Sequence, residues 1–344
     1  MPGPRIRKGR SPWAAVLCYI LLRSFKTRYC CSLPLRLFAP TLRALRFRHW
    51  SYRNEREATR KEPQRNSASS SKLHQRPKTS RRRETRLLNF AIQTARDAGA
   101  ILADRLGRAG VSNKGDIDLV TEADLASEKL IIERIKSHYP RHAILAEESG
   151  ATDGIETVRG QNDSKWIIDP LDGTTNYAHG YPCFCVSIAL ERAGSIEIGV
   201  IYDPTRDEMF AAERGQGATL NDRRIHVSNV EDLNSAMLCT GFPYNVRERV
   251  NFARDFTNFT MEAQAVRRDG SASLDLAYIA CGRFDGFWED GLNAWDVAAG
   301  VLLIEEAGGL ITDFTGAPLD IYTPKVLASN GLVHNAMRRV LGNA

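Results

Sequence analysis

The sequence changes character sharply near residue 87, and this break decides which part of the chain can fold into a compact domain. Residues 1–86 contain 23 Lys and Arg against 4 Asp and Glu, a net charge of +19. The other 258 residues carry 24 basic and 37 acidic side chains, a net charge of −13. Apolar residues at helical spacing begin at Leu87. We therefore predict a basic N-terminal extension over residues 1–86 and a folded domain over residues 87–344.

The N-terminal extension is predicted to be largely disordered. Residues 54–86 are polar, rich in Ser and Arg and almost free of large apolar side chains. Such a composition buries too little surface to offset the loss of chain entropy on folding. The apolar run from Trp13 to Leu22 is far shorter than the roughly 20 residues of a spanning helix, so the sequence predicts no membrane span.

Three interpretations of the extension stay open. An Arg-rich, acid-poor segment is typical of an organellar transit peptide. A disordered basic arm can also tether a protein to nucleic acid or to a membrane surface. We favour the third, that these residues lie upstream of the natural start, because the folded pattern begins cleanly near Leu87. One observation weighs against this interpretation. The sequence has no Met between Met1 and Met209, so an internal start would require a non-standard start codon.

The acidic domain is poorly suited to bind nucleic acid through its surface charge and well suited to hold divalent cations. The chain has seven Cys and no CxxC spacing, which suits a reducing compartment. We therefore expect a cytoplasmic protein, or an organellar one if the extension is a genuine transit segment. Cys183 and Cys185 alternate in an apolar run and are expected in the core, on one face of a strand.

Hydrophobic periodicity predicts a mixture of helices and strands. Two helices are expected over residues 87–107 and 122–139, the second with an inward face of Leu125, Leu130, Ile131 and Ile135. Buried strands are expected over 142–149 and from 164 to 169, then an antiparallel meander over 183–192, 195–204, 208–214 and 217–222. The C-terminal half mixes helices over 273–282 and 295–309 with short strands over 284–289, 310–315 and 326–330. Helices stacked on mixed sheets, an α+β or α/β fold, are the expected result.

Acidic residues follow the ends of these buried elements. Asp169 and Asp172 come directly after a buried strand, and Pro170 between them stiffens the turn so that both carboxylates can face one point. Hard divalent ions such as Mg²⁺ prefer such carboxylate oxygens. Glu147 ends a second buried strand, and Asp296 opens a helix. The sequence therefore predicts a metal site rather than a solvated acidic turn.

The residues beside this acidic pair suit a phosphate. Gly173 allows a close approach of the backbone to a ligand. Thr174 and Thr175 are expected to cap a following helix whose first amides would receive phosphate.

Longer segments carry a resemblance to a known family. WIIDPLDGTTNYAHGYP and NAWDVAAGVLLIEEAGG closely resemble the two signatures of the inositol monophosphatase family. AEES is similar to its Gly-Glu-Glu-Ser element, with Ala146 in place of Gly, and DIDLVTEAD to an upstream segment. RRDGSASLDLAY and FDGFWEDGLNAWD look most like bacterial members. The resemblance covers residues 87–343 and implies a catalytic domain with a layered α-β-α-β-α sandwich of the inositol monophosphatase and fructose bisphosphatase type, usually as a homodimer.

The resemblance also implies two or three Mg²⁺ ions. One would be held by Glu147, Asp169 and the backbone carbonyl of Leu171, and a second by Asp169, Asp172 and Asp296. A third, weaker ion is usual near Glu147. The catalytic residues implied are Glu147, Thr174 and Asp124, because Thr174 matches the residue that positions the attacking water and Asp124 matches the carboxylate that holds this threonine.

The substrate-binding residues implied by the resemblance are Asp172, Gly173, Thr174, Gly270, Ser271, Ala272 and Glu289. A carboxylate such as Glu289 can accept hydrogen bonds from vicinal ring hydroxyls, which suits inositol or a sugar. Lys114 is a candidate for attracting phosphate, although a plain surface lysine is an equally open interpretation.

The function implied is Mg²⁺-dependent hydrolysis of myo-inositol monophosphate to myo-inositol and phosphate, by direct attack of a metal-bound water and with inhibition by Li⁺. Fructose-1,6-bisphosphatases, histidinol-phosphate phosphatases and 3′-phosphoadenosine nucleotide phosphatases belong to the same superfamily and remain alternatives. A hypothesis from another class is an interaction role in transcription or ribosome assembly, as in some bacterial relatives.

Overall fold

The computed structural model describes residues 78–108, 110–113, 119–152, 164–242, 251–323 and 325–342. Residues 1–77 lie outside these ranges, so the three interpretations of the N-terminal extension stay predictions.

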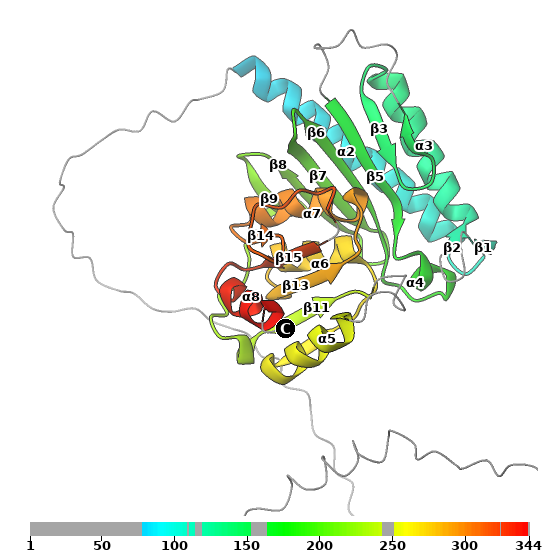
Figure 1. Ribbon diagram of the computed structural model, residues 1–344. Helices are drawn as coiled ribbons and strands as arrows, with labels where there is room; N and C mark the ends of the chain where they lie inside the picture. Colours follow the sequence, from blue (N-terminus) through cyan, green and yellow to red (C-terminus); the bar gives the residue numbers. More distant parts are fainter. Residues whose placement is uncertain are drawn as a thin grey trace, which may run out of the picture. The chain divides into compact units, whose positions relative to one another are not determined.

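The strands of the described residues form one large sheet, one smaller sheet and a two-stranded pair (Figure 1). The large sheet has eight strands in the order β10-β9-β8-β7-β6-β5-β3-β4. They are β3 (Ala143–Ala146), β4 (Gly150–Thr152), β5 (Ser164–Asp172), β6 (Cys185–Arg192), β7 (Ser195–Asp203), β8 (Glu208–Glu213), β9 (Gly217–Leu220) and β10 (Arg223–Arg224). The smaller sheet, in the order β12-β11-β13-β15-β14, contains β11 (Met237–Thr240), β12 (Ala265–Arg267), β13 (Gly286–Asp290), β14 (Leu310–Thr312) and β15 (Lys325–Ser329). The pair is β1 (Val111–Asn113) and β2 (Leu119–Thr121).

Strand β5 lies inside the large sheet, parallel to β3 and antiparallel to β6. All its residues are buried except the half-buried Lys165. A strand covered on both faces reads as a continuous apolar run rather than an alternating one, and this explains the sequence pattern before Asp169. From β5 to β9 each strand pairs antiparallel with the next, so the predicted meander is confirmed.

Helices form the remaining layers. They are α2 (Lys78–Arg105), α3 (Glu122–His138), α4 (Thr174–Ala178), α5 (Asn251–Glu262), α6 (Ala272–Ala280), α7 (Ala294–Glu306) and α8 (His334–Gly342), with a short 3₁₀ turn, η1 (Leu233–Ser235). Helices α2 and α3 cover one face of the large sheet, and α7 covers the other with α6 beside it. Helix α6 also contacts the smaller sheet, and α5 and α8 lie against β12 and β15. The predicted α-β-α-β-α sandwich is therefore confirmed (Figure 1).

Three buried hydrophobic clusters hold these layers together. The first, including Trp166 and Phe184, lies between the large sheet and the helices α2 and α3. The second joins the large sheet, α6, α7 and the smaller sheet. The third includes Phe259 of α5, Trp288 of β13 and Met337 of α8, so it fixes the strand that carries Glu289.

Several local predictions differ from the structure. Helix α2 begins at Lys78, nine residues before the periodic pattern, because residues 78–86 contain no large apolar side chain from which a periodicity could be recognised. Leu125 is 54% exposed, so the predicted inward face of α3 is wrong there. Helix α3 turns Asp124 and Glu128 inward instead. Cys183 is buried as predicted but lies just before strand β6.

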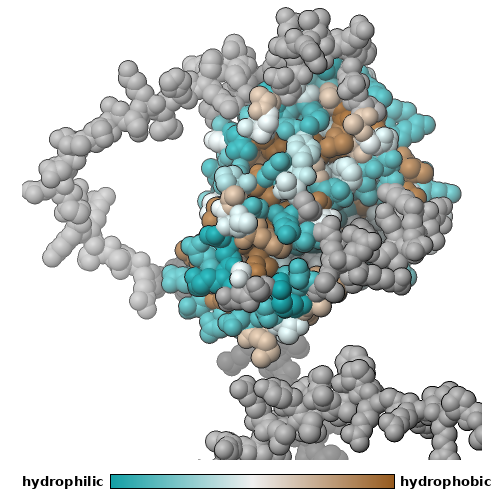
Figure 2. Space-filling view, in the orientation of Figure 1, coloured by the Kyte–Doolittle hydropathy of each residue, from teal (hydrophilic) through white to brown (hydrophobic). Residues whose placement is uncertain are grey.

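On the face drawn in Figure 2, hydrophilic residues cover most of the coloured surface, and hydrophobic residues lie in smaller patches between them. The large exposed hydrophobic side chains among the described residues come from separate parts of the chain; they are Leu125, Tyr181, Met261, Leu310, Tyr322 and Leu332. Among the described helices, none combines the length and the apolar character that crossing a bilayer requires.

The third cluster generates a stability prediction. The ring of Phe259 is fully buried and stacks on Trp288 at a centroid distance of 3.9 Å. We expect Phe259→Ala to lower the free energy of unfolding by about 3–5 kcal/mol, because it removes this contact and leaves a cavity. Met261→Ala on the same helix is the control, since Met261 is 76% exposed and its loss should change stability by about 0.5 kcal/mol or less. Urea denaturation of both variants measures this, and equal effects would contradict the assignment.

Candidate active site

The predicted acidic residues meet at one pocket of about 250 Å³. It lies where β3, β5 and β13 end and where α6 and α7 begin. The predicted site residues that line it are Glu147, Asp169, Leu171, Asp172, Gly173, Thr174, Gly270, Ser271, Ala272, Glu289 and Asp296. Asp124 does not line the pocket but contacts Thr174, which does. Lys114 lies outside the described residues. Segments separated by more than 100 positions in the chain are thus brought to one point.

An irregular strand pairing brings Asp169 and Asp172 together. Residues three apart on a regular strand point to opposite faces of the sheet. Here Asp169 lies opposite Ser187 and Asp172 lies opposite Cys185, so three steps along β5 match two along β6. This bulge changes the direction of the strand between the two carboxylates. The prediction that they share one point therefore depends on a bulge in addition to Pro170.

Glu147 reaches the pocket because β3 and β5 are parallel and end at the same edge. Ala146 is paired with Ile168, and the backbone amide of Glu147 donates to the carbonyl of Ile168 at 3.2 Å. The next position along β5 is Asp169, and Glu147 is close enough to raise the pKa of the Asp169 carboxyl group.

Asp172 is anchored by the start of helix α6. Its Oδ2 accepts hydrogen bonds from the Ser271 hydroxyl at 2.7 Å and from the Ser273 amide at 2.6 Å. A carboxylate at a helix N-terminus is stabilised by the free amides and by the helix dipole. One oxygen of Asp172 therefore joins the large sheet to α6. Ser271, which the resemblance assigns to substrate, contacts this carboxylate.

Asp296 is the third residue of α7 and caps its own helix. Its Oδ2 accepts a hydrogen bond from the Asn293 amide at 2.7 Å, which leaves Oδ1 as a second acceptor. Its position in the first turn is therefore fixed by the backbone that precedes the helix.

Thr174 lies at the start of the short helix α4. Its hydroxyl lies 3.2 Å from Asp124 Oδ1 and 3.0 Å from the Leu171 carbonyl oxygen, the two acceptors open to it. The residue that caps this helix is Gly173, in a left-handed conformation with φ of 98°. The prediction that Thr174 and Thr175 are the caps is therefore wrong. A Cβ at Gly173 would lie 2.8 Å from the Cys183 carbonyl, so the turn requires glycine.

The electrostatics of the pocket are strongly unbalanced. Among the described residues that line it, six carry carboxylates and only Arg268 carries a positive charge. Burial raises the pKa of Asp169 well above its usual range, and the charges of Glu147, Asp172 and Asp296 raise it further. Burial and the charge of Asp172 do the same to the pKa of Asp296. Each deprotonated carboxylate therefore disfavours ionisation of the next.

The pKa values of three other carboxyl groups in and beside the pocket are also raised. Burial raises the pKa of Asp172, against the hydrogen bonds from Ser271 and Ser273. Burial likewise raises the pKa of Asp124. Burial raises the pKa of Glu289 to about 8, although Arg268 acts in the opposite direction.

Two charged residues at the pocket were not predicted. Asp275 on α6 is 1% exposed, and its Oδ1 has no hydrogen-bond partner. Burial raises its pKa well above the usual range. Arg268 lies 5.2 Å from the ring centroid of Phe242. The helical spacing of Asp275 among apolar residues is a signal for inward orientation, whereas nothing local to the sequence marks Arg268.

The donor set fits a hard divalent cation. Buried carboxylates are costly unless they are paired or coordinate a metal, and Asp169 and Asp296 have mainly other carboxylates as charged neighbours. Oxygen donors of this kind are those that Mg²⁺ prefers. Within the described ranges, however, no three acidic, His or Cys side chains already form a complete metal centre. The fit is therefore one of chemistry and proximity.

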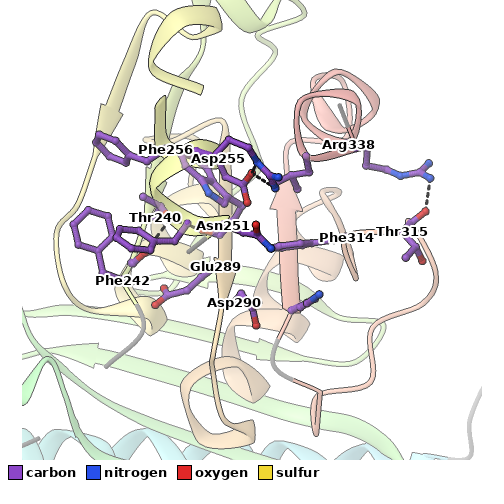
Figure 3. A pocket seen from close by; sticks show the side chains of 17 residues that line it. Thr240, Phe242, Asn251, Asp255, Phe256, Glu289, Asp290, Phe314, Thr315 and Arg338 are labelled. Atoms are coloured by element: carbon purple, nitrogen blue, oxygen red, sulfur yellow. Dashed lines mark hydrogen bonds and ion pairs between the residues drawn. The ribbon is translucent and has the colours of Figure 1, made fainter. Parts of the chain in front are cut away.

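A second, larger pocket of about 600 Å³ lies on the other side of Glu289 (Figure 3). It shares Gly241, Phe242 and Glu289 with the acidic pocket. Aromatic side chains of Phe252, Phe256, Trp288 and Phe314 supply much of its wall. A Cβ at Gly241 would lie within 2.5 Å of the Glu289 carboxyl atoms, so this glycine leaves the space that Glu289 occupies.

Comparisons with known proteins agree with this geometry. The sequence model described as "Inositol monophosphatase family" matches residues 83–342. An inositol-1-monophosphatase of Synechocystis is 45% identical over 74% of this chain and 88% of its own length. The protein named "Nus factor SuhB" of Pseudomonas aeruginosa is 45% identical over 71% of this chain and 91% of its own length.

Among solved structures, an inositol monophosphatase from Anabaena superposes with a TM-score of 0.68 at 47% identity, over 76% of this chain and 96% of that one. The resemblance inferred from the sequence motifs is confirmed: the chain belongs to the inositol monophosphatase family.

Proposed function

We propose that this protein is a Mg²⁺-dependent phosphomonoesterase that hydrolyses myo-inositol monophosphate to myo-inositol and phosphate. The observation that carries the proposal is the pocket lined by six carboxylate side chains and one arginine, at the positions where the family motifs lie. The ligands proposed for two or three ions are Glu147, Asp169, the Leu171 carbonyl, Asp172 and Asp296. Bound Mg²⁺ would offset their repulsion, polarise the phosphate and lower the pKa of water.

The chain's own residues supply orientation and a path for a proton. Thr174 Oγ1 lies within hydrogen-bonding distance of Asp124 Oδ1, and Asp124 Oδ2 accepts from the Thr121 amide at 2.9 Å. Asp124 is therefore held rigidly and fixes the Thr174 hydroxyl at the pocket wall. A water beside Thr174 can be oriented by this hydroxyl and can pass a proton to Glu147, whose carboxyl lies on the same wall.

The alcohol part of the substrate is proposed to lie toward Glu289. This side chain is 8% exposed and can accept hydrogen bonds from two adjacent hydroxyls of a polyol. Because the larger pocket continues beyond Glu289, phosphomonoesters bulkier than inositol phosphate belong in any substrate comparison. Sugar bisphosphates and nucleotides are the alternatives that such a comparison must include.

Phosphate release from inositol 1-phosphate is the direct test. We expect Asp169→Asn to lower kcat by at least about 100-fold, because the residue proposed to bridge two ions loses its charge. Removing Mg²⁺ should abolish activity of the wild type. The exposed Asp104→Asn is the control. Equal rates for Asp169→Asn and wild type would contradict the metal assignment, and a higher kcat/KM for fructose 1,6-bisphosphate or a nucleotide would overturn the named substrate.

The raised pKa values predict a linked effect of pH and Mg²⁺ on stability. Carboxylates with raised pKa bind more protons in the folded than in the unfolded state, so the stability of the Mg²⁺-free protein should fall as the pH rises from about 5 to about 8, the pKa of Glu289. Mg²⁺ binds the deprotonated form. The increase in Tm on adding Mg²⁺ should therefore be larger at about pH 8 than at about pH 6.

The control for this effect is Asp296→Asn, which removes one of the charges that line the pocket. Its Tm should depend less on pH without Mg²⁺, and Mg²⁺ should raise it less. A Mg²⁺-induced increase in Tm that is the same at both pH values would contradict the linkage.

A second candidate function is an interaction role, which is favoured by the relatives named "Nus factor SuhB" at 45% identity. Such a role would use the surface of the acidic domain rather than the pocket. It is compatible with hydrolysis in the same protein.

The two functions respond differently to one substitution. We expect Asp296→Asn to abolish phosphate release, because a proposed ligand charge is lost, and to leave capture of macromolecular partners within about twofold of wild type, because Asp296 lines the pocket rather than the outer surface. Pull-down from the protein's own cell extract measures the second quantity. Loss of partners in parallel with hydrolysis would contradict the separation.

A further inference from the structure

The first two turns of helix α3 bury a polar face. Asp124 and Ser127 are fully buried, and Glu128 is 5% exposed, whereas the apolar Leu125 between them faces solvent. An ordinary surface helix turns its apolar residues inward and its polar ones outward. Burying a carboxylate such as Glu128 costs free energy unless a specific partner receives it. This inverted pattern therefore requires polar partners for these side chains on the buried side of α3.

Glu128 has its partner beside the proposed metal ligand Glu147. The backbone amide of Glu148 donates to Glu128 Oε2 at 2.9 Å. On the other side, the amide of Glu147 itself donates to the Ile168 carbonyl at 3.2 Å. The peptide that carries the Glu147 side chain is thus fixed from β5 before it and from α3 after it.

Ser127 makes the equivalent contact on the aspartate strand. Its hydroxyl donates to the Pro170 carbonyl at 2.8 Å, and both groups are buried. Pro170 lies between Asp169 and Leu171, inside the bulge that brings the two aspartates together. Proline has no amide hydrogen, so its carbonyl is the one hydrogen-bonding group of this residue.

One rigid helix therefore holds three separate parts of the site. Asp124 contacts Thr174, Ser127 contacts the bulge between the aspartates, and Glu128 contacts the peptide after Glu147. Neither Ser127 nor Glu128 lines the acidic pocket. Groups that orient ligands in this way commonly change metal affinity about 10–100-fold when they are removed.

We propose that Ser127 and Glu128 are positioning residues for the metal site, which set the distance between Glu147 and the Asp169–Asp172 bulge of β5. The inference rests on the proposed Mg²⁺ site at these carboxylates. It assigns the buried polar face of α3 a function that is separate from the stability of the helix.

Direct Mg²⁺ binding to the full chain, measured by calorimetry without substrate, tests this inference. Glu128→Ala should raise the Kd for Mg²⁺ about tenfold or more, and Ser127→Ala should raise it by a smaller factor. Glu128→Gln keeps an acceptor oxygen for the Glu148 amide, so it should stay within about threefold of wild type. In turnover, Glu128→Ala should need more Mg²⁺ for half-maximal rate, with the KM for inositol 1-phosphate nearly unchanged.

The matched control is Glu133→Ala, because Glu133 lies on the same helix with its side chain 67% exposed. It should bind Mg²⁺ like wild type. If wild type itself binds no Mg²⁺, the proposed function fails. If wild type binds and Glu128→Ala binds equally well, the positioning role is wrong. If Glu128→Ala does not fold, Ser127→Ala decides, since Mg²⁺ binding equal to wild type by this variant would contradict the positioning role.

Discussion

The mutual repulsion of buried carboxylates is the constraint on which this structure depends. Asp169 and Asp172 are buried, Glu147 and Asp296 are half-buried beside them, and the charges of Glu147 and Asp172 raise the pKa of both Asp169 and Asp296. Like charges at one point are unfavourable in the folded protein unless a cation joins them. The surrounding fold therefore has to hold the side chains against their own repulsion, and the rigid elements around the pocket do this.

Each carboxylate is held by a different element. The bulge in β5 orients Asp169 and Asp172, the start of α6 binds Asp172, and the cap of α7 binds Asp296. The parallel pairing of β3 with β5 fixes Glu147. Because these contacts come from strand ends and helix starts, the two large hydrophobic clusters that pack the layers also set the geometry of the site.

The sequence was most informative where a local pattern has a single structural meaning. The apolar run before Asp169 predicted a fully buried strand, and the alternation after Cys183 predicted the meander. It was misleading where tertiary contacts override local preference. Leu125 suits the inside of a helix but faces solvent, because Asp124, Ser127 and Glu128 have polar partners beneath α3. Thr174 suits a helix cap, but Gly173 caps the helix and Thr174 turns to Asp124.

By itself, the sequence determined the family, many of the elements and most of the acidic residues of the pocket, because ordered motifs and hydrophobic periodicity are local properties of the chain. Only the tertiary structure decided which contacts these residues make. Asp172 is held by the Ser273 amide, 101 positions away, Asp275 and Arg268 join the pocket from α6 and the segment before it, and α3 links the end of β3 to the bulge of β5. These contacts depend on how the layers are stacked, and no spacing along the chain encodes that stacking.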